Sequence, residues 1–172
     1  RNPLGVLAAN LRLLERRGAD AETVADMREQ IDRAGRFVDD LLRYGRPRPL
    51  ELRMVDPGAA LDLALSTARA ALPDSPAVEW ERVNLDGAAV IEADQAQLEQ
   101  VLVVLISNAI LADPKRGRLS LTGDGQTVAL TVEDAGPGIP EALGERIFEA
   151  FVTGRKREGQ QAGTGLGLAI AR

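Results

Sequence analysis

Two stretches at the start of the chain repeat their apolar residues with helical spacing. In residues 4–17 one stripe collects Leu4, Leu7, Ala8, Leu11 and Leu14. In residues 21–44 the apolar positions alternate three and four apart, the spacing of a coiled coil, at Val24, Met27, Ile31, Ala34, Val38 and Leu41. Neither helix can bury its stripe alone. We therefore expect an antiparallel hairpin over residues 4–44 that dimerises into a four-helix bundle. The alternative is a hairpin packed on the rest of its own chain.

The helical pattern stops at a short proline-containing segment. Gly45-Arg-Pro47-Arg-Pro49 cannot continue a helix, because proline lacks the backbone N–H and clashes with the preceding turn. Beyond it the apolar period changes from helical to mixed. We expect a domain boundary here, with one domain over residues 1–46 and a second over residues 47–172.

The second part of the chain alternates strand and helix patterns. Strands are expected at 50–55, 78–83, 88–92, 118–122 and 127–133, and helices at 59–72, 94–112, 140–148 and 166–170. Asp86-Gly87 and Gly123-Asp-Gly125 are hairpin turn signals. The last helix stops at Arg172, and the first begins without a Met, so we expect a piece of a longer protein. The fold class is α+β: a helical hairpin, then a sandwich with helices on one face of a mixed, mostly antiparallel sheet, truncated at both ends.

Composition narrows the possible chemistry. The chain has no His and no Cys, which excludes a histidine base, a histidine metal ligand and a thiolate site within these residues. A net charge of −5 argues against binding duplex nucleic acid. The longest apolar run, residues 101–106, is too short to span a bilayer. Any membrane contact is therefore expected only through segments outside this chain.

Two glycine-rich turns carry the candidate chemistry. Asp134-Ala-Gly136-Pro-Gly138 places a carboxylate at the end of a strand, before glycines that let a flat ligand approach the backbone. Gly163-Thr-Gly-Leu-Gly167 leads into a helix, and such a turn points backbone N–H groups at an anion. An acceptor and a phosphate cradle together indicate a nucleotide; two merely structural turns are the alternative. Asn108, a polar residue in an apolar helical stripe, is either a satisfied structural amide or a ligand contact.

The order of these motifs resembles a known family. Asn108, Asp134-Ala-Gly-Pro-Gly138, Phe148-Glu-Ala-Phe151 and Gly163-Thr-Gly-Leu-Gly-Leu168 are similar to the N, G1, F and G2 boxes of sensor histidine kinases. Those kinases share the Bergerat ATP-binding fold with gyrase, MutL and a heat-shock chaperone. Arg1-Asn-Pro-Leu-Gly5 resembles the end of the H box, His-Glu-x-Arg-Asn-Pro-Leu. Further segments resemble the nitrogen-regulatory subgroup, namely 46–50, 108–112 and 151–155.

The resemblance implies a set of roles for ATP and Mg²⁺. Asp134 would accept a hydrogen bond from the adenine amine, with Gly136 and Gly138 allowing close approach of the base. Asn108 would be the metal ligand, since an amide oxygen suits Mg²⁺. A lid over about residues 139–163 would close on the nucleotide, anchored by Phe148 and Phe151. The remaining implied ATP contacts are Arg155, Gly163, Thr164, Gly165, Leu166 and Gly167.

The resemblance also implies a function and its rivals. The expected function is the core of a two-component sensor histidine kinase in the cytoplasm. It would autophosphorylate a His just upstream of Arg1 and pass the phosphoryl group to an Asp of a response-regulator receiver domain. Position 104 is Val, where kinases usually have Asn and related ATPases have a water-activating Glu, and Leu111 also replaces a polar residue. These departures favour the alternative, a nucleotide-binding pseudokinase or regulatory dimer, and argue against a third reading as an ATP hydrolase.

Overall fold

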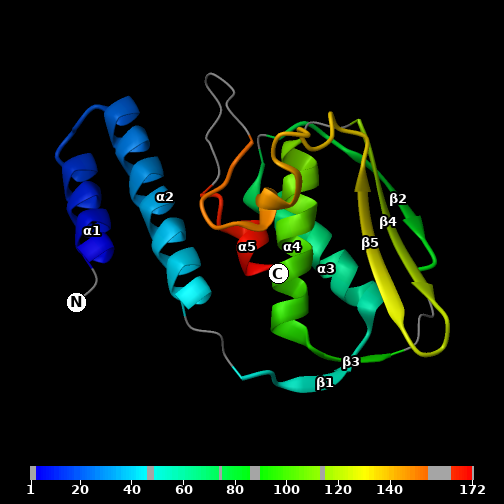
Figure 1. Cartoon of the computed structure of the whole chain (residues 1–172). Helices are drawn as coiled ribbons and strands as arrows, with labels where there is room; N and C mark the ends of the chain where they lie inside the picture. The colour runs from blue at the N-terminus through cyan, green and yellow to red at the C-terminus, as the bar shows by residue number, and fades with distance from the viewer. Residues whose placement is uncertain are drawn as a thin grey trace. The chain divides into compact units, whose positions relative to one another are not determined.

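The computed structural model describes residues 3–45, 49–73, 75–85, 90–112, 115–154 and 164–171. It divides into two compact units, Arg1–Pro47 and Arg48–Arg172. Figure 1 shows the two helices of the first unit and the helices and strands of the second.

The first unit is a helical hairpin. Helix α1 covers Pro3–Arg16 and helix α2 covers Ala21–Gly45. The connection follows local rules: Gly18 adopts a φ of +80°, and Asp20 accepts a hydrogen bond of 2.8 Å from the Thr23 N–H. Leu11 and Val24 are buried in the hairpin. A large part of the apolar surface remains exposed, at Val6, Leu7, Leu13, Leu14, Met27, Phe37, Val38, Leu41 and Leu42.

The second unit packs two helices against a mixed sheet. Strand β2 (Glu79–Val83) pairs in parallel with β4 (Arg116–Gly123), which pairs antiparallel with β5 (Val128–Asp134). Helices α3 (Pro57–Ala71) and α4 (Gln95–Leu111) lie on one face of this sheet (Figure 1). The buried core between the layers includes Leu61, Leu65, Leu102, Ile106, Leu119 and Leu121. A fully buried Leu or Ile side chain contributes about 1.5–3 kcal/mol, so this layer contact stabilises the unit.

The strand pairing differs from the expected sheet at one point. The sequence predicts a hairpin between residues 78–83 and 88–92, but β3 (Ile91–Asp94) pairs antiparallel with β1 (Leu52–Val55) in a separate two-stranded sheet. The hairpin prediction is therefore wrong, although the expected turn at 86–87 lies outside the described residues. The physical reason is that β2 satisfies its ladder in parallel with β4, a long-range pairing that a local turn signal does not reveal. The 123–125 hairpin, by contrast, is confirmed.

The segment after β5 is less regular than predicted. Instead of a helix over 140–148, residues 141–143 form a turn and Gly144–Phe148 form a single 3₁₀ segment, η1. A 3₁₀ turn tolerates the glycine at its start and ends after a few residues, because its hydrogen-bond geometry is poorer than that of an α-helix. The final helix, α5, covers Gly167–Ile170.

Candidate functional site

The first glycine turn begins where β5 ends. Asp134 is the last residue of β5, and its Oδ1 accepts a hydrogen bond of 2.8 Å from the Gly136 N–H. The intervening Ala135 donates its N–H to the Arg116 carbonyl at 3.0 Å, which ties the turn to the start of β4. Asp134 itself is exposed. Its Oδ2 accepts no hydrogen bond from the described residues, so this oxygen is available to a ligand.

Gly136 stands at a position that has no space for a side chain. A Cβ at Gly136 would lie 2.6 Å from Asp134 Oδ1 and 2.8 Å from Ala112 Cβ, closer than real Cβ contacts. The turn is therefore packed directly onto the C-terminal end of α4, where Ala112 is the capping residue. Gly138, two residues further on, has a φ of +75°, a conformation that L side chains rarely adopt.

The second glycine turn is fastened at two points. Phe151 donates its N–H to the Gly165 carbonyl at 2.9 Å, and both residues have a positive φ, +68° for Phe151 and +69° for Gly165. A Cβ on Gly165 would lie 2.7 Å from the Phe151 carbonyl carbon. Thr164 Oγ1 accepts a hydrogen bond of 3.3 Å from the Leu166 N–H. The backbone of the turn is thus shaped by contacts within the unit, and its sole bulky residue, Leu166, is 0% exposed.

Helix α4 connects the two turns. Val104, Asn108 and Ala112 are four residues apart and share one stripe of the helix. Ala112 abuts Gly136 of the first turn. At the other end of the stripe, a Cβ on Gly167 would lie 3.2 Å from Val104 Cγ1, so the start of α5 packs on Val104. Half-buried Asn108 therefore lies on the helix between the contacts made by the two glycine turns.

Val104 and Ala112 are contacts that the sequence pattern did not reveal. The sequence marks Val104 only as a departure from the family motif, and Ala112 only as the last residue of the 108–112 segment. Their role follows from what they touch, namely glycines 24 or more residues later in the chain. A small residue at 112 and an apolar one at 104 are the signals, and both are too common in helices to be informative alone.

Other predicted site residues are exposed or lie outside the described residues. Phe148 is 39% and Phe151 is 56% exposed, so neither ring is buried in the core. Arg155 and Gly163 lie outside the described residues, as does most of the second half of the expected lid. Among the described residues there is no group of three or more acidic side chains placed to hold a metal ion. Asn108 therefore remains the candidate ligand supplied by the described part of the chain.

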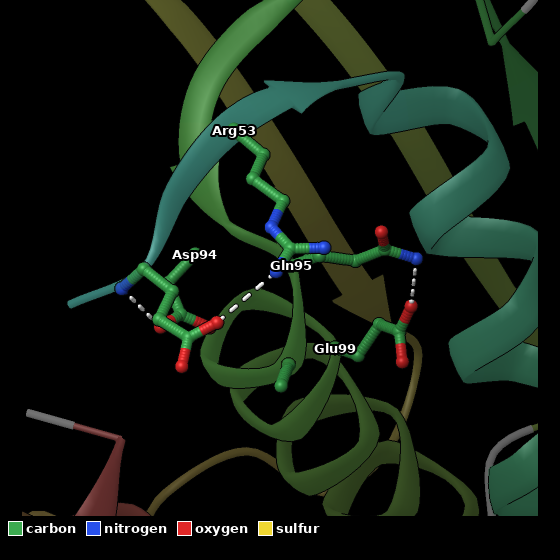
Figure 2. Close-up of a pocket in the computed structure, with 6 residues that line it drawn as sticks. Arg53, Asp94, Gln95 and Glu99 are labelled. Atoms are coloured by element: carbon green, nitrogen blue, oxygen red, sulfur yellow. Dashed lines mark hydrogen bonds and ion pairs between the residues drawn. The ribbon is translucent and has the colours of Figure 1, made fainter. Parts of the chain in front are cut away.

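A surface pocket lies at the opposite end of α4. It has a volume of about 310 Å³ and is lined by Glu51, Arg53, Asp94, Gln95, Ala96 and Glu99 (Figure 2). Asp94 caps α4 there: it accepts hydrogen bonds of 2.9 Å from the Glu51 N–H and 3.0 Å from the Gln97 N–H. The bond from Glu51, followed by that from Gln97, holds the pKa of Asp94 below its usual value. This pocket is separated from Asn108 by the length of the helix, and it is distinct from the glycine turns.

Comparison with known proteins defines the class first. Residues 93–172 match the family described as histidine kinase-, DNA gyrase B-, and HSP90-like ATPases. This range begins at the end of β3 and contains α4 and both glycine turns. The candidate site therefore lies in an ATPase domain of this class.

Relatives that align with the whole chain identify the class of protein more narrowly than the domain family does. The chain is 38% identical over 180 residues to TcrY of Mycobacterium tuberculosis, named a probable sensor histidine kinase, covering 99% of this chain and 37% of TcrY. It is 34% identical over 188 residues to NtrB of Salmonella typhimurium, a sensory histidine kinase/phosphatase, covering 100% of this chain and 51% of NtrB. A crystal structure of full-length ShkA in complex with AMPPNP superimposes with a TM-score of 0.79 at 30% identity, covering 98% of this chain and 36% of that one.

The chain belongs to the two-component sensor histidine kinases and carries their core. It spans 37% of the length of TcrY and 51% of that of NtrB. Within the described residues, no helix is both long and apolar enough to cross a membrane.

Proposed function

We propose that residues 47–172 bind ATP with Mg²⁺ between the two glycine turns. One observation carries the proposal: Asn108 lies on α4 between Ala112, which abuts Gly136, and Val104, which abuts Gly167. A carboxylate acceptor, an amide oxygen and a glycine cradle are thus grouped around one helix. The ShkA structure, whose fold this chain shares, was determined with AMPPNP, a nucleotide of the same kind.

The residues present suit such a ligand. Asp134 Oδ2 can accept a hydrogen bond from the exocyclic amine of adenine, and guanine has a carbonyl at the same ring position. At Gly136 and Gly165 a Cβ would collide with neighbouring protein atoms, so glycine lets the backbone of each turn pack closely against the rest of the site. Thr164, Leu166 and Gly167 would form the phosphate cradle with Gly163 and Arg155. Asn108 would hold Mg²⁺, which neutralises phosphate charge when bound.

The packing of Val104 defines its part in this site. Its side chain meets Gly167, so it supports the start of α5 and offers no oxygen to a metal or to water. The domain is thereby suited to positioning a phosphoryl group for transfer, which needs orientation and charge neutralisation more than covalent help. An activated water, as in hydrolysis, has no general base at this position.

The helical unit would supply the acceptor and the dimer. Residues 4–44 expose the apolar side chains of α1 and α2 already named, a surface that a second copy would cover in a four-helix bundle. The acceptor would be a His just upstream of Arg1, and a response-regulator receiver Asp would take the phosphoryl group from it. Because the reaction consumes ATP, we place this part of the protein in the cytoplasm.

Phosphoryl incorporation tests the proposal. A form of the protein extended upstream of Arg1 is incubated with γ-labelled ATP and Mg²⁺, and the product is tested for acid-labile, alkali-stable label. We expect such label in the wild type and its loss in Asp134→Ala and Asn108→Ala. Asp124→Ala is the matched control, because Asp124 is a turn carboxylate in the β4–β5 hairpin whose loss should leave labelling intact.

Each outcome separates the candidate functions. ATP binding without label would contradict phosphoryl transfer and leave a nucleotide-binding pseudokinase. Loss of label in Asp124→Ala as large as in Asp134→Ala would show that the assay reports folding instead of the site. Free phosphate release without phosphoprotein would point to hydrolysis and contradict the role assigned to Val104.

A further inference from the structure

A row of three residues crosses the sheet at the edge where Asp134 lies. In the strand register Trp80 of β2 is the partner of Gly117 of β4, and Gly117 is the partner of Asp134 of β5. Partners in neighbouring strands project from the same face of a sheet. Leu119, two residues after Gly117, is fully buried under the helices, so this is the helix-covered face. Trp80, Gly117 and Asp134 therefore form one row on the same side as the candidate nucleotide site.

The indole ring of Trp80 occupies the middle of that row. A Cβ on Gly117 would lie 2.6 Å from Cζ3, 2.8 Å from Cε3 and 3.0 Å from Cη2 of Trp80. The edge of the six-membered ring of Trp80 therefore lies over Gly117 on the helix-covered face of the sheet. Asp134 is the next residue along the row. The edge of an aromatic ring carries partial positive charge, which favours a neighbouring carboxylate.

The indole N–H of Trp80 lowers the stability of the folded protein. Its Nε1–H is buried and has no hydrogen-bond partner among the described residues. A buried, unsatisfied donor costs about 1–3 kcal/mol, and a Phe at this position would avoid that cost. Core packing alone therefore does not explain the indole, although the side chain does pack against the buried core.

We propose that Trp80 is a positioning residue for Asp134: its ring fills the space above Gly117 and confines the carboxylate to the direction of the nucleotide base. The inference rests on the proposed ATP site and goes beyond it by naming the residue that sets the acceptor's orientation. ATP then changes the surroundings of Trp80, and the shape of this residue affects how well the site distinguishes ATP from GTP.

Fluorescence provides the first test, because Trp80 is the single Trp of the chain. The chain is titrated with ATP and with GTP in the presence of Mg²⁺, under selective excitation of tryptophan, while calorimetry measures binding independently. We expect ATP to shift or quench the emission with the same half-saturation as the calorimetric Kd, and GTP to do so only at higher concentration. Asp134→Ala should abolish the response.

Three variants separate positioning from packing. Trp80→Leu should weaken ATP binding roughly threefold to tenfold, within the range of couplings between neighbouring residues, and lower the ATP/GTP preference. Trp80→Phe keeps an aromatic edge and removes the unsatisfied N–H, but its shorter ring fills the space above Gly117 only in part, so it should lower the ATP/GTP preference less than Trp80→Leu does. In the Asp134→Ala background, Trp80→Leu should have no further effect on ATP binding.

Val128→Ala is the matched control, since it removes packing from the same face of β5 at the far end of the hairpin. It should lower stability and leave the ATP/GTP preference unchanged. Calorimetric ATP binding with constant emission, and an unchanged preference in Trp80→Leu, would overturn the positioning role while leaving the proposed function in place. Absence of calorimetric ATP binding in the wild type would instead overturn both.

Discussion

The two ends of α4 are held in place in different ways. At its start, Asp94 accepts hydrogen bonds from two backbone N–H groups, those of Glu51 and Gln97, and the residues that line the pocket beside it are charged or polar apart from Ala96. At its end, Ala112 meets Gly136 at a distance that admits no side chain, and one turn earlier stands Asn108. The first end is held by hydrogen bonds that any capped helix uses. The second end depends on Gly136, which packs against Ala112 where no side chain would fit.

This difference separates stability from function. A helix cap can be exchanged for another acceptor at modest cost, because it satisfies only the backbone. A glycine packed against a carboxylate or a backbone cannot be exchanged without moving the atoms that would bind a ligand. We therefore expect substitutions at the start of α4 to change the free energy of unfolding, and those at its end to change ATP binding.

The largest effect is expected for Gly165→Ala. Gly165 has a φ of +69°, and a Cβ there would lie 2.7 Å from the Phe151 backbone. Left-handed backbone costs an L-residue about 1–2 kcal/mol, and the collision must also displace the hydrogen bond from the Phe151 N–H. ATP affinity measured by calorimetry should fall by at least about tenfold, a factor that corresponds to 1.4 kcal/mol.

Gly125→Ala is the control for backbone strain. Gly125 has a φ of +87° but no atom within 4 Å of a Cβ, and it lies in the β4–β5 turn. Gly125→Ala should lower the free energy of unfolding, measured with denaturant, by about 1–2 kcal/mol, the cost of a left-handed backbone alone. ATP affinity should stay the same. Equal losses of ATP affinity in both variants would mean that general destabilisation explains the result.

A smaller effect is expected for Gly136→Ala. The added methyl would press on both Asp134 Oδ1 and Ala112 Cβ, and overpacking of this kind costs about 1–3 kcal/mol. Both stability and ATP affinity should fall. Adding Ala112→Gly removes one of the two collisions, so it should restore part of the packing loss but not ATP affinity, because the collision with Asp134 remains. Full recovery of ATP affinity in the double variant would contradict the role given to Asp134.

Asp94→Ala tests the opposite end of the helix. Loss of the cap should lower the free energy of unfolding by about 0.5–2 kcal/mol, as for other N-cap substitutions. The ATP Kd of the folded protein should be unchanged. Asp56→Ala is a matched comparison, since Asp56 caps α3 through the Gly58 and Ala59 N–H groups. A drop in ATP affinity in Asp94→Ala, but not in Asp56→Ala, would show that the two ends of α4 are coupled.

The smallest effect is expected when the pH is lowered, through the contribution of Asp94 to the free energy of unfolding. The Glu51 and Gln97 N–H bonds lower the pKa of Asp94 in the folded state relative to about 3.9 in the unfolded chain. The stability that this carboxylate contributes is therefore present above the unfolded pKa and is lost as the pH falls through the folded pKa. Urea unfolding of Asp94→Asn between neutral and acidic pH should show a shallower decline than the wild type. An identical pH slope would mean that Asp94 does not titrate differently on folding.

The sequence predicted the local features because their signals are local. The turn signal Gly123-Asp-Gly125 contains the carboxylate that the turn uses, because Asp124 accepts the N–H groups of Gln126 and Thr127. Asp56 and Asp94 likewise accept N–H groups only two or three residues later in the chain. The order of glycine motifs and Asn108 likewise indicated an ATP-binding domain of the family to which the chain belongs. The hairpin expected after β2 failed, because a parallel partner 37 residues away took its place, as in the pairing of Trp80 with Gly117.

What the sequence by itself determined was the identity of the elements and the family of the chain: helix periods, caps, turns and ordered glycine motifs depend on neighbouring residues. What the tertiary structure decided was why particular residues stand where they do. Gly136 is small because Ala112 and Asp134 fill its space, and Val104 faces Gly167 across two elements. Trp80 lies over Gly117 because two strands meet in register. Such contacts join residues distant in sequence, and their distances exist only once the chain has folded.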